Sequence, residues 1–343
     1  MIDWKRLSLA VLLSVAAIAC GDNELPDDGS GDGGDGPITT EFVEVFSSTN
    51  FASASESPRA YSLDDQAYVV DGIFGFDTYR FADSVLTRTF VDGSTSDNPW
   101  LATAFAATAD RIVVKGIANQ SIPSIRIYRR NSSSTPTFLG QAPIDAATGP
   151  VGAFSNFVLS ASVERNGIQI WDAQDPNDLT ATDFYETTAQ VRDFVIADNA
   201  LYALVGRDIL MYSIHESGAA LQFEGDYPLL AESARIKAEG GYLLVTEQEY
   251  PKVLSVTEPF NPVVAYEGPE MSQNNPPLAM GAGYLFVGTA TNVLALRQNG
   301  GTFVPETEIE ALGPTTELVV VDNLLYVFSA GEGLQIIRAP AAP

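Results

Sequence analysis

Residues 193–206 read DFVIADNALYALVG: an apolar run, a short polar turn and a second apolar run that ends in glycine. Self-similarity at a fixed period indicates a repeated supersecondary unit. This arrangement occurs seven times in the chain, and the other copies are AYSLDDQAYVVDG (60–72), AFAATADRIVVKG (104–116), GAFSNFVLSAS (152–162), RIKAEGGYLLVTE (235–247), LAMGAGYLFVGTA (278–290) and LVVVDNLLYVFSAG (318–331).

The copies are evenly spaced. The central positions of the second apolar runs lie 43 residues apart on average: Tyr68, Ile112, Val158, Tyr202, Leu243, Leu285 and Tyr326. Each copy is followed by a third strand-like run and, in all but the last, by a fourth. Four short strands in about 43 residues are typical of one blade of a β-propeller. The sequence therefore predicts an all-β fold, a seven-bladed β-propeller of four-stranded blades over residues 38–339.

The two ends of the repeated region complement each other. The seventh copy has only three strands before Ala339, and residues 340–343 form a short C-terminal tail. A surplus strand-like run, TEFVEVF at 40–46, precedes the first copy. We predict that this N-terminal strand completes the last blade as its outer strand. Closure of this kind removes the open sheet edges that invite aggregation.

The third and fourth strands of some copies carry a sharper motif. Residues 166–177 read NGIQIWDAQDPN, residues 252–262 read KVLSVTEPFNP, and residues 333–337 repeat the front half as GLQII. This pattern resembles the LVIVD repeat, although the sharp motif covers only two and a half blades. The resemblance implies a bacterial or archaeal surface or secreted propeller, often a lipoprotein, of a family without an agreed activity.

Composition excludes several kinds of function. The 343 residues include 44 acidic and 18 basic side chains, a net charge of −26, with one histidine and one cysteine. Scattered basic residues in so acidic a chain argue against nucleic acid as a partner, because binding phosphates requires clustered Lys and Arg. One cysteine and one histidine exclude an internal disulfide, an iron–sulfur cluster and any Cys- or multi-His-based metal site. We expect no cofactor and a monomeric chain.

The N-terminus predicts secretion and lipidation. Lys5 and Arg6 precede the apolar run 7–19, which is too short to span a membrane and typical of a signal peptide. The run ends in AIAC at 17–20, which resembles the bacterial lipobox, so Cys20 is the predicted lipidation site. The alternative is ordinary cleavage near Ala19 that leaves a free cysteine.

An acidic linker follows the cysteine. Residues 1–19 are thus the predicted signal peptide, and residues 20–37 a lipidated Cys and a flexible tether rich in Gly and Asp. The alternating aspartates leave Ca²⁺ binding open as a weaker alternative, because the EF-hand spacing is missing. These features predict a bacterial cell-envelope lipoprotein anchored through its lipid, in the outer membrane at the periplasmic face or the cell surface.

Candidate ligand-binding residues are found on the innermost strands. Arg59, Arg192 and Arg235 lie at or near the start of these strands in blades one, four and five, and Asp193 and Glu317 belong to the same layer. Arginine binds anions through paired donors, so the three could form an anion-binding channel mouth. The favoured alternative is that they pair with the carboxylates and hold blades together.

Other chemical signals are weak. The sole histidine, His215, is expected in a loop after the third strand of blade four and away from any catalytic partner. Acidic residues recur at the turn between the first two strands, where they favour turn formation or, as the alternative, gather a cation: Asp64, Asp110, Asp198, Glu239 and Asp322. No catalytic residue is assigned, since no nucleophile or phosphate-binding motif is present.

Three functions are compatible with these sequence features. The favoured one is a non-enzymatic binding module for a protein or a glycan. The second is a periplasmic-face scaffold lipoprotein in envelope assembly. The third is a lyase or hydrolase that uses channel carboxylates.

Overall fold

The computed structural model describes residues 41–48, 59–63, 65–71, 75–92, 100–118, 121–131, 134–145, 148–162, 165–215 and 220–340. The predicted signal peptide, Cys20, the tether, Asp64 and residues 341–343 lie outside these residues. Contact density divides the chain into Met1–Ile38 and Thr39–Pro343, and all described residues belong to the second unit. The described residues contain no helix that could cross a membrane.

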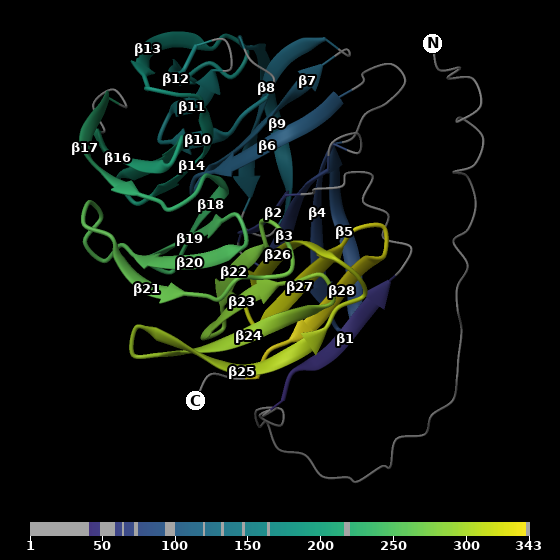
Figure 1. Cartoon of the computed structure of the whole chain (residues 1–343). Helices are drawn as coiled ribbons and strands as arrows, with labels where there is room; N and C mark the ends of the chain where they lie inside the picture. The colour runs from purple at the N-terminus through teal and green to yellow at the C-terminus, as the bar shows by residue number, and fades with distance from the viewer. Residues whose placement is uncertain are drawn as a thin grey trace, which may run out of the picture. The chain divides into compact units, whose positions relative to one another are not determined.

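Thr39–Pro343 forms seven antiparallel four-stranded sheets, or blades (Figure 1). The innermost strands are β2 (Arg59–Leu63), β6 (Trp100–Ala107), β10 (Val151–Phe154), β14 (Val191–Ala197), β18 (Ser233–Glu239), β22 (Leu278–Gly281) and β26 (Thr315–Val321). The second strands are β3 (Gln66–Asp71), β7 (Arg111–Ala118), β11 (Phe157–Ser162), β15 (Ala200–Val205), β19 (Tyr242–Glu247), β23 (Tyr284–Gly288) and β27 (Leu324–Ser329).

The third strands are β4 (Gly75–Ala82), β8 (Ile122–Asn131), β12 (Gly167–Asp172), β16 (Asp208–His215), β20 (Tyr250–Ser255), β24 (Asn292–Asn299) and β28 (Gly333–Arg338). The outer strands are β5 (Val85–Asp92), β9 (Ser134–Pro143), β13 (Thr180–Glu186), β17 (Ala220–Pro228), β21 (Val263–Glu267), β25 (Thr302–Glu310) and β1 (Val43–Ser48). The predicted seven-bladed β-propeller is confirmed.

Burial of the second strands explains the repeat. All seven predicted central positions lie on second strands and are at most 3% exposed. Each strand alternates its side chains between two faces, so one blade contributes to the cores on both of its sides. The structure has seven apolar clusters, one between each pair of neighbouring blades, including one between blades seven and one.

The N-terminal strand closes the ring as predicted. It ends at Ser48, two residues beyond the predicted end at Phe46. β1 pairs antiparallel with β28, and Val43 lies opposite Arg338 while Ser48 lies opposite Leu334. Phe42 and Phe46 extend the packing to neighbouring blades, because Phe42 contacts Tyr284 and Phe46 contacts Phe81 edge-on. Blade seven therefore depends on both ends of the domain.

The motif that resembles the LVIVD repeat connects neighbouring blades. Its turn in blade three approaches β9 of blade two so closely that a Cβ on Gly140 would lie 2.6 Å from Asn177 Oδ1. Arg111 of β7 donates to the carbonyl of Ala173 at 2.7 Å. In the second copy, the Tyr202 hydroxyl of blade four donates to the carbonyl of Pro259 in blade five at 2.9 Å. Both turns thus contact the preceding blade.

Deleting residues 38–48 is expected to lower the melting temperature by about 10 °C. The deletion removes the β1–β28 ladder, whose backbone hydrogen bonds each contribute about 0.5–1.5 kcal/mol, and it exposes apolar side chains in two clusters. Deleting residues 21–37 is the control. Differential scanning calorimetry compares the two proteins, and equal melting temperatures would contradict closure by β1.

Candidate functional site

The innermost strands of the seven blades surround a cavity of about 440 Å³. All seven contribute to its lining, so residues far apart in the sequence meet on the ring axis. Small apolar side chains from β6 and β10 form one part of the lining, among them Ala106 and Ala153. Six acidic or basic side chains lie in the rest: Arg59, Asp193, Arg235, Lys237, Glu239 and Glu317.

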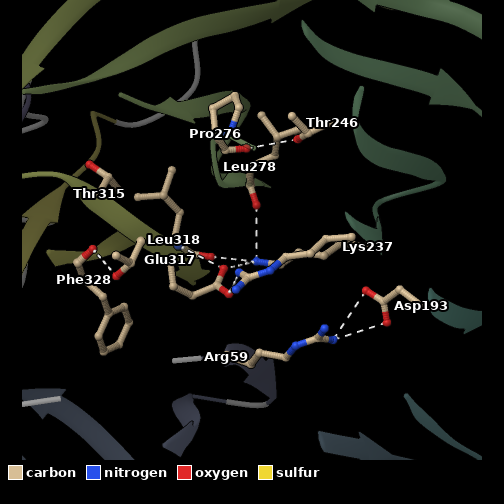
Figure 2. Close-up of polar contacts among 12 residues, drawn as sticks. Arg59, Asp193, Lys237, Thr246, Pro276, Leu278, Thr315, Glu317, Leu318 and Phe328 are labelled. Atoms are coloured by element: carbon tan, nitrogen blue, oxygen red, sulfur yellow. Dashed lines mark hydrogen bonds and ion pairs between the residues drawn. The ribbon is translucent and has the colours of Figure 1, made fainter. Parts of the chain in front are cut away.

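Arg59 of blade one reaches Asp193 of blade four. Figure 2 shows the Arg59 side chain pointing toward Asp193. Arg59 Nη1 lies 3.2 Å from Asp193 Oδ1 and 3.4 Å from Oδ2. The Asp193 side chain is 6% exposed and that of Arg59 is 27% exposed. The neighbouring carboxylate raises the pKa of Arg59 further above its ordinary range, against the opposing effect of burial. Because blades one and four are not neighbours, this ion pair links distant parts of the ring.

A second group joins blades five, six and seven. Glu317 of β26 is 1% exposed and receives Arg235 Nη1 at 2.8 Å and Lys237 Nζ at 2.5 Å. Lys237 also donates to the carbonyl of Leu278 at 3.2 Å and to that of Leu318 at 2.9 Å (Figure 2). An ammonium group has three donors, and all three of Lys237 are used.

The carboxylates of the cavity also accept hydrogen bonds from backbone N–H groups of the innermost strands. An innermost strand has one edge without a neighbouring strand, so its N–H groups need other acceptors. Asp193 accepts from Phe194 N at 3.1 Å and from Ile236 N at 3.2 Å. Glu317 accepts from Leu318 N at 3.1 Å, and Glu239 accepts from Met280 N. Acidic residues on these strands therefore have a structural reason to be present.

Arg192 does not line the cavity, which corrects the prediction that it shares a site with Arg59 and Arg235. The β14–β15 register slips between Val191 and Asp193, so Arg192 is the extra residue of a bulge. A bulge changes the direction of the side chains beside it. The exposed Arg192 pairs with Glu232, while Asp193 enters the cavity.

Four of the five predicted residues, Arg59, Arg235, Asp193 and Glu317, line one cavity, and each arginine pairs with a carboxylate. Their role toward a ligand stays a prediction. The sequence interpretation missed Lys237, which alternates with Arg235 on the same strand, and Tyr61, which alternates with Arg59. This spacing of two was the available signal, because residues i and i+2 of a strand share a face.

Glu239 also differs from its predicted role as a turn residue. It is the last residue of β18, and its carboxylate accepts from a backbone amide of the next blade instead of bonding within its own turn. Burial raises the pKa of Glu239 to about 7, with a further rise from Glu317, and Lys237 and the Met280 amide oppose this shift. Glu239 thus exchanges a proton near neutral pH.

Other candidates lie away from the cavity. His215 is the last residue of β16 rather than a loop residue, is exposed, and its Nε2 lies 3.2 Å from Gln222 Oε1. Lys115 is fully buried between blades two and three, where it donates to the carbonyls of Thr148 and Ala161. Within the described ranges, no group of three or more His, Cys, Asp or Glu side chains is placed to hold a metal ion.

Solved structures share this architecture at low sequence identity. The β-propeller domain of Myceliophteria thermophila Cps50 (Swd1) has a TM-score of 0.63 at 11% identity, over 85% of this chain and 99% of that one. A putative 6-phosphogluconolactonase from Bacteroides uniformis has a TM-score of 0.64 at 10% identity, over 80% and 92% of the two chains. The fold is a β-propeller.

A third similar structure is the Pseudomonas aeruginosa periplasmic gluconolactonase PpgL, with a TM-score of 0.59 at 13% identity, over 76% of this chain and 87% of that one. Identities this low establish the fold alone. No family model matches the chain, and no curated protein matches it either. The resemblance to the LVIVD repeat therefore stays a prediction from the motif.

Replacing the three arginines singly by Gln should separate their roles. Arg59→Gln leaves Asp193 without a cation and is expected to cost about 2–3 kcal/mol, less than a fully buried pair because Arg59 is partly exposed. Arg235→Gln should cost about 1–2 kcal/mol, since Lys237 still pairs with Glu317. Arg192→Gln, an exposed pair, is the control and should cost at most about 1 kcal/mol. Urea unfolding measures the order, and equal losses would contradict it.

The raised pKa of Glu239 predicts a pH-dependent stability. Between its ordinary value of 4.5 and about 7, the folded protein binds this proton and the unfolded chain does not. Rising pH in this window therefore removes stability, at most roughly 3 kcal/mol. Glu239→Gln keeps the acceptor for Met280 and should flatten this part of the profile, with a higher melting temperature than the wild type at pH 8. Exposed Glu186→Gln is the control, and identical profiles for all three proteins would refute the assignment.

Proposed function

We propose that this protein is a lipid-anchored, non-enzymatic binding module of the bacterial cell envelope whose ligand occupies the central cavity. The observation that carries the proposal is the convergence of six acidic or basic side chains from four blades on one cavity. Its volume of about 440 Å³ falls within the range of about 300–1,000 Å³ common for ligand sites.

The electrostatics of the cavity support ligand binding as well as stability. Three cations and two buried carboxylates, Asp193 and Glu317, surround a space that also holds Glu239. Arg59 and Arg235 each use one nitrogen in their ion pairs. Since a guanidinium has five N–H donors, both arginines retain donors for a ligand.

The predicted N-terminal signal peptide and lipidation site support placement in the cell envelope. The signal peptide, Cys20 and the acidic tether at 20–37 are sequence features that lie outside the described residues. Two or more acyl chains hold a protein stably at a membrane, since each buried methylene contributes ~0.8 kcal/mol. A tether of 18 residues then leaves the propeller free to present its cavity to a glycan or protein of the envelope.

A lyase or hydrolase acting in the same cavity is the second candidate. Glu239 favours it, because a carboxyl group with a pKa near 7 can both donate and accept a proton at the working pH. In an enzyme, Glu239→Gln would abolish turnover. In a binding module, the variant would bind and leave its ligand chemically unchanged.

The test combines membrane fractionation with a binding screen on the full chain purified from detergent-solubilised membranes. Cys20→Ser should release the protein from the membrane pellet, and a variant that stays bound in high salt would contradict lipidation.

On an array of envelope glycans and peptides, the wild type should bind a subset of spots. Ala106→Phe, which fills the cavity, should lose them, whereas the surface variant Arg192→Gln should keep them. Binding that survives Ala106→Phe would place the ligand elsewhere.

A further inference from the structure

We infer that the cavity binds a single uronate, a sugar that carries one carboxylate, at the end of a saccharide chain. The inference rests on the proposed binding function and specifies its ligand. It follows from which donors are free, from the local charge and from the mixture of acceptors and apolar surface around the axis.

Among the three cations that line the cavity, the two arginines retain N–H groups for an anion, whereas the lysine does not. Lys237 uses its three donors on Glu317 and the carbonyls of Leu278 and Leu318. Arg235 uses Nη1 on Glu317. Arg59 uses Nη1 on both oxygens of Asp193 and also donates to the Tyr61 hydroxyl, so Arg235 has more free donors than Arg59. A carboxylate is planar and takes two parallel N–H donors from a guanidinium, which the free edges of these side chains can offer.

The local charge favours one anionic group and disfavours several. Arg59, Arg235 and Lys237 exceed Asp193 and Glu317 by one positive charge, and Glu239 is half protonated near neutral pH. The whole chain has a net charge of −26, so the cavity is far less negative than the rest of the protein. A polyanion is repelled by such a surface. A ligand with a single carboxylate is attracted by the arginines of the cavity and is repelled least by the carboxylates of the protein.

Sugar hydroxyls suit the remaining groups. Glu239 Oε2 accepts from Met280 N, and its other carboxyl oxygen makes no hydrogen bond to a described residue. A hydroxyl can donate to the ionised carboxyl group or accept from the protonated one. Tyr61 is partly exposed in the cavity and stacks on Phe105 with ring centroids 4.8 Å apart. Its ring and the small side chains of Ala106 and Ala107 provide an apolar surface for the C–H face of a sugar.

The experiment is isothermal titration calorimetry on the detergent-purified full chain. The probes are an aldobiouronic acid with a terminal glucuronate, the same disaccharide with glucose in place of glucuronate, and phenylacetate as an apolar carboxylate. We expect the acidic disaccharide to bind at least about tenfold more tightly than the other two, since one charge-assisted hydrogen bond is worth about this factor. Arg235→Gln should weaken it at least about tenfold, and Arg192→Gln should leave it unchanged.

Ala106→Phe provides a second variant that leaves every ion pair in place, so loss of folding in Arg235→Gln does not end the test. Binding of the acidic disaccharide that Ala106→Phe abolishes supports the inference. Equal binding of the neutral disaccharide, tighter binding of phenylacetate, or no binding of any probe overturns it. Each of these failures concerns the uronate alone, because the array of envelope glycans and peptides tests cavity-dependent binding with ligands of any chemistry.

Discussion

A four-stranded blade has two apolar faces, and it can bury both only between two other blades. All seven apolar clusters of this protein lie between neighbouring blades, so no blade has a core of its own. Burial of apolar surface contributes ~25 cal/mol per Å², and the ring must close for the first and last blades to gain it. Pairing of β1 with β28 supplies this closure. The central cavity and its ion pairs depend on this closure of the ring.

Closure also creates the cavity. Seven innermost strands meet the axis with unpaired edges, and their amides require acceptors that neighbouring strands cannot supply. Asp193, Glu239 and Glu317 accept from these amides, and the cations that neutralise Asp193 and Glu317 follow from that. A charged axis is therefore a structural consequence of the ring. The same arrangement leaves guanidinium donors facing an open space, which is the basis for the proposed ligand binding.

The two arginine ion pairs are buried at one end and exposed at the other. The ion pairs of Arg59 and Arg235 reach carboxylates that are almost fully buried, whereas the arginines are about one-quarter exposed. Their buried ends hold blades together and their exposed edges meet the cavity. Lys115 differs, because it is fully buried away from the cavity, where it donates to the carbonyls of Thr148 and Ala161 and thereby joins β7 to the segment before β10 and to β11.

The sequence by itself determined the number of blades, the strand order and the closure, because these depend on local alternation of apolar residues and on a period of 43 residues that is visible without a structure. It also determined that acidic and basic residues share the innermost layer. Only the tertiary structure decided which of them meet. A one-residue bulge directs Arg192 to the surface and Asp193 to the axis, and residues such as Lys237 and Glu317 are 80 positions apart in the chain. Periodicity records which face of a strand a residue occupies, whereas bulges and contacts across the ring depend on packing between blades.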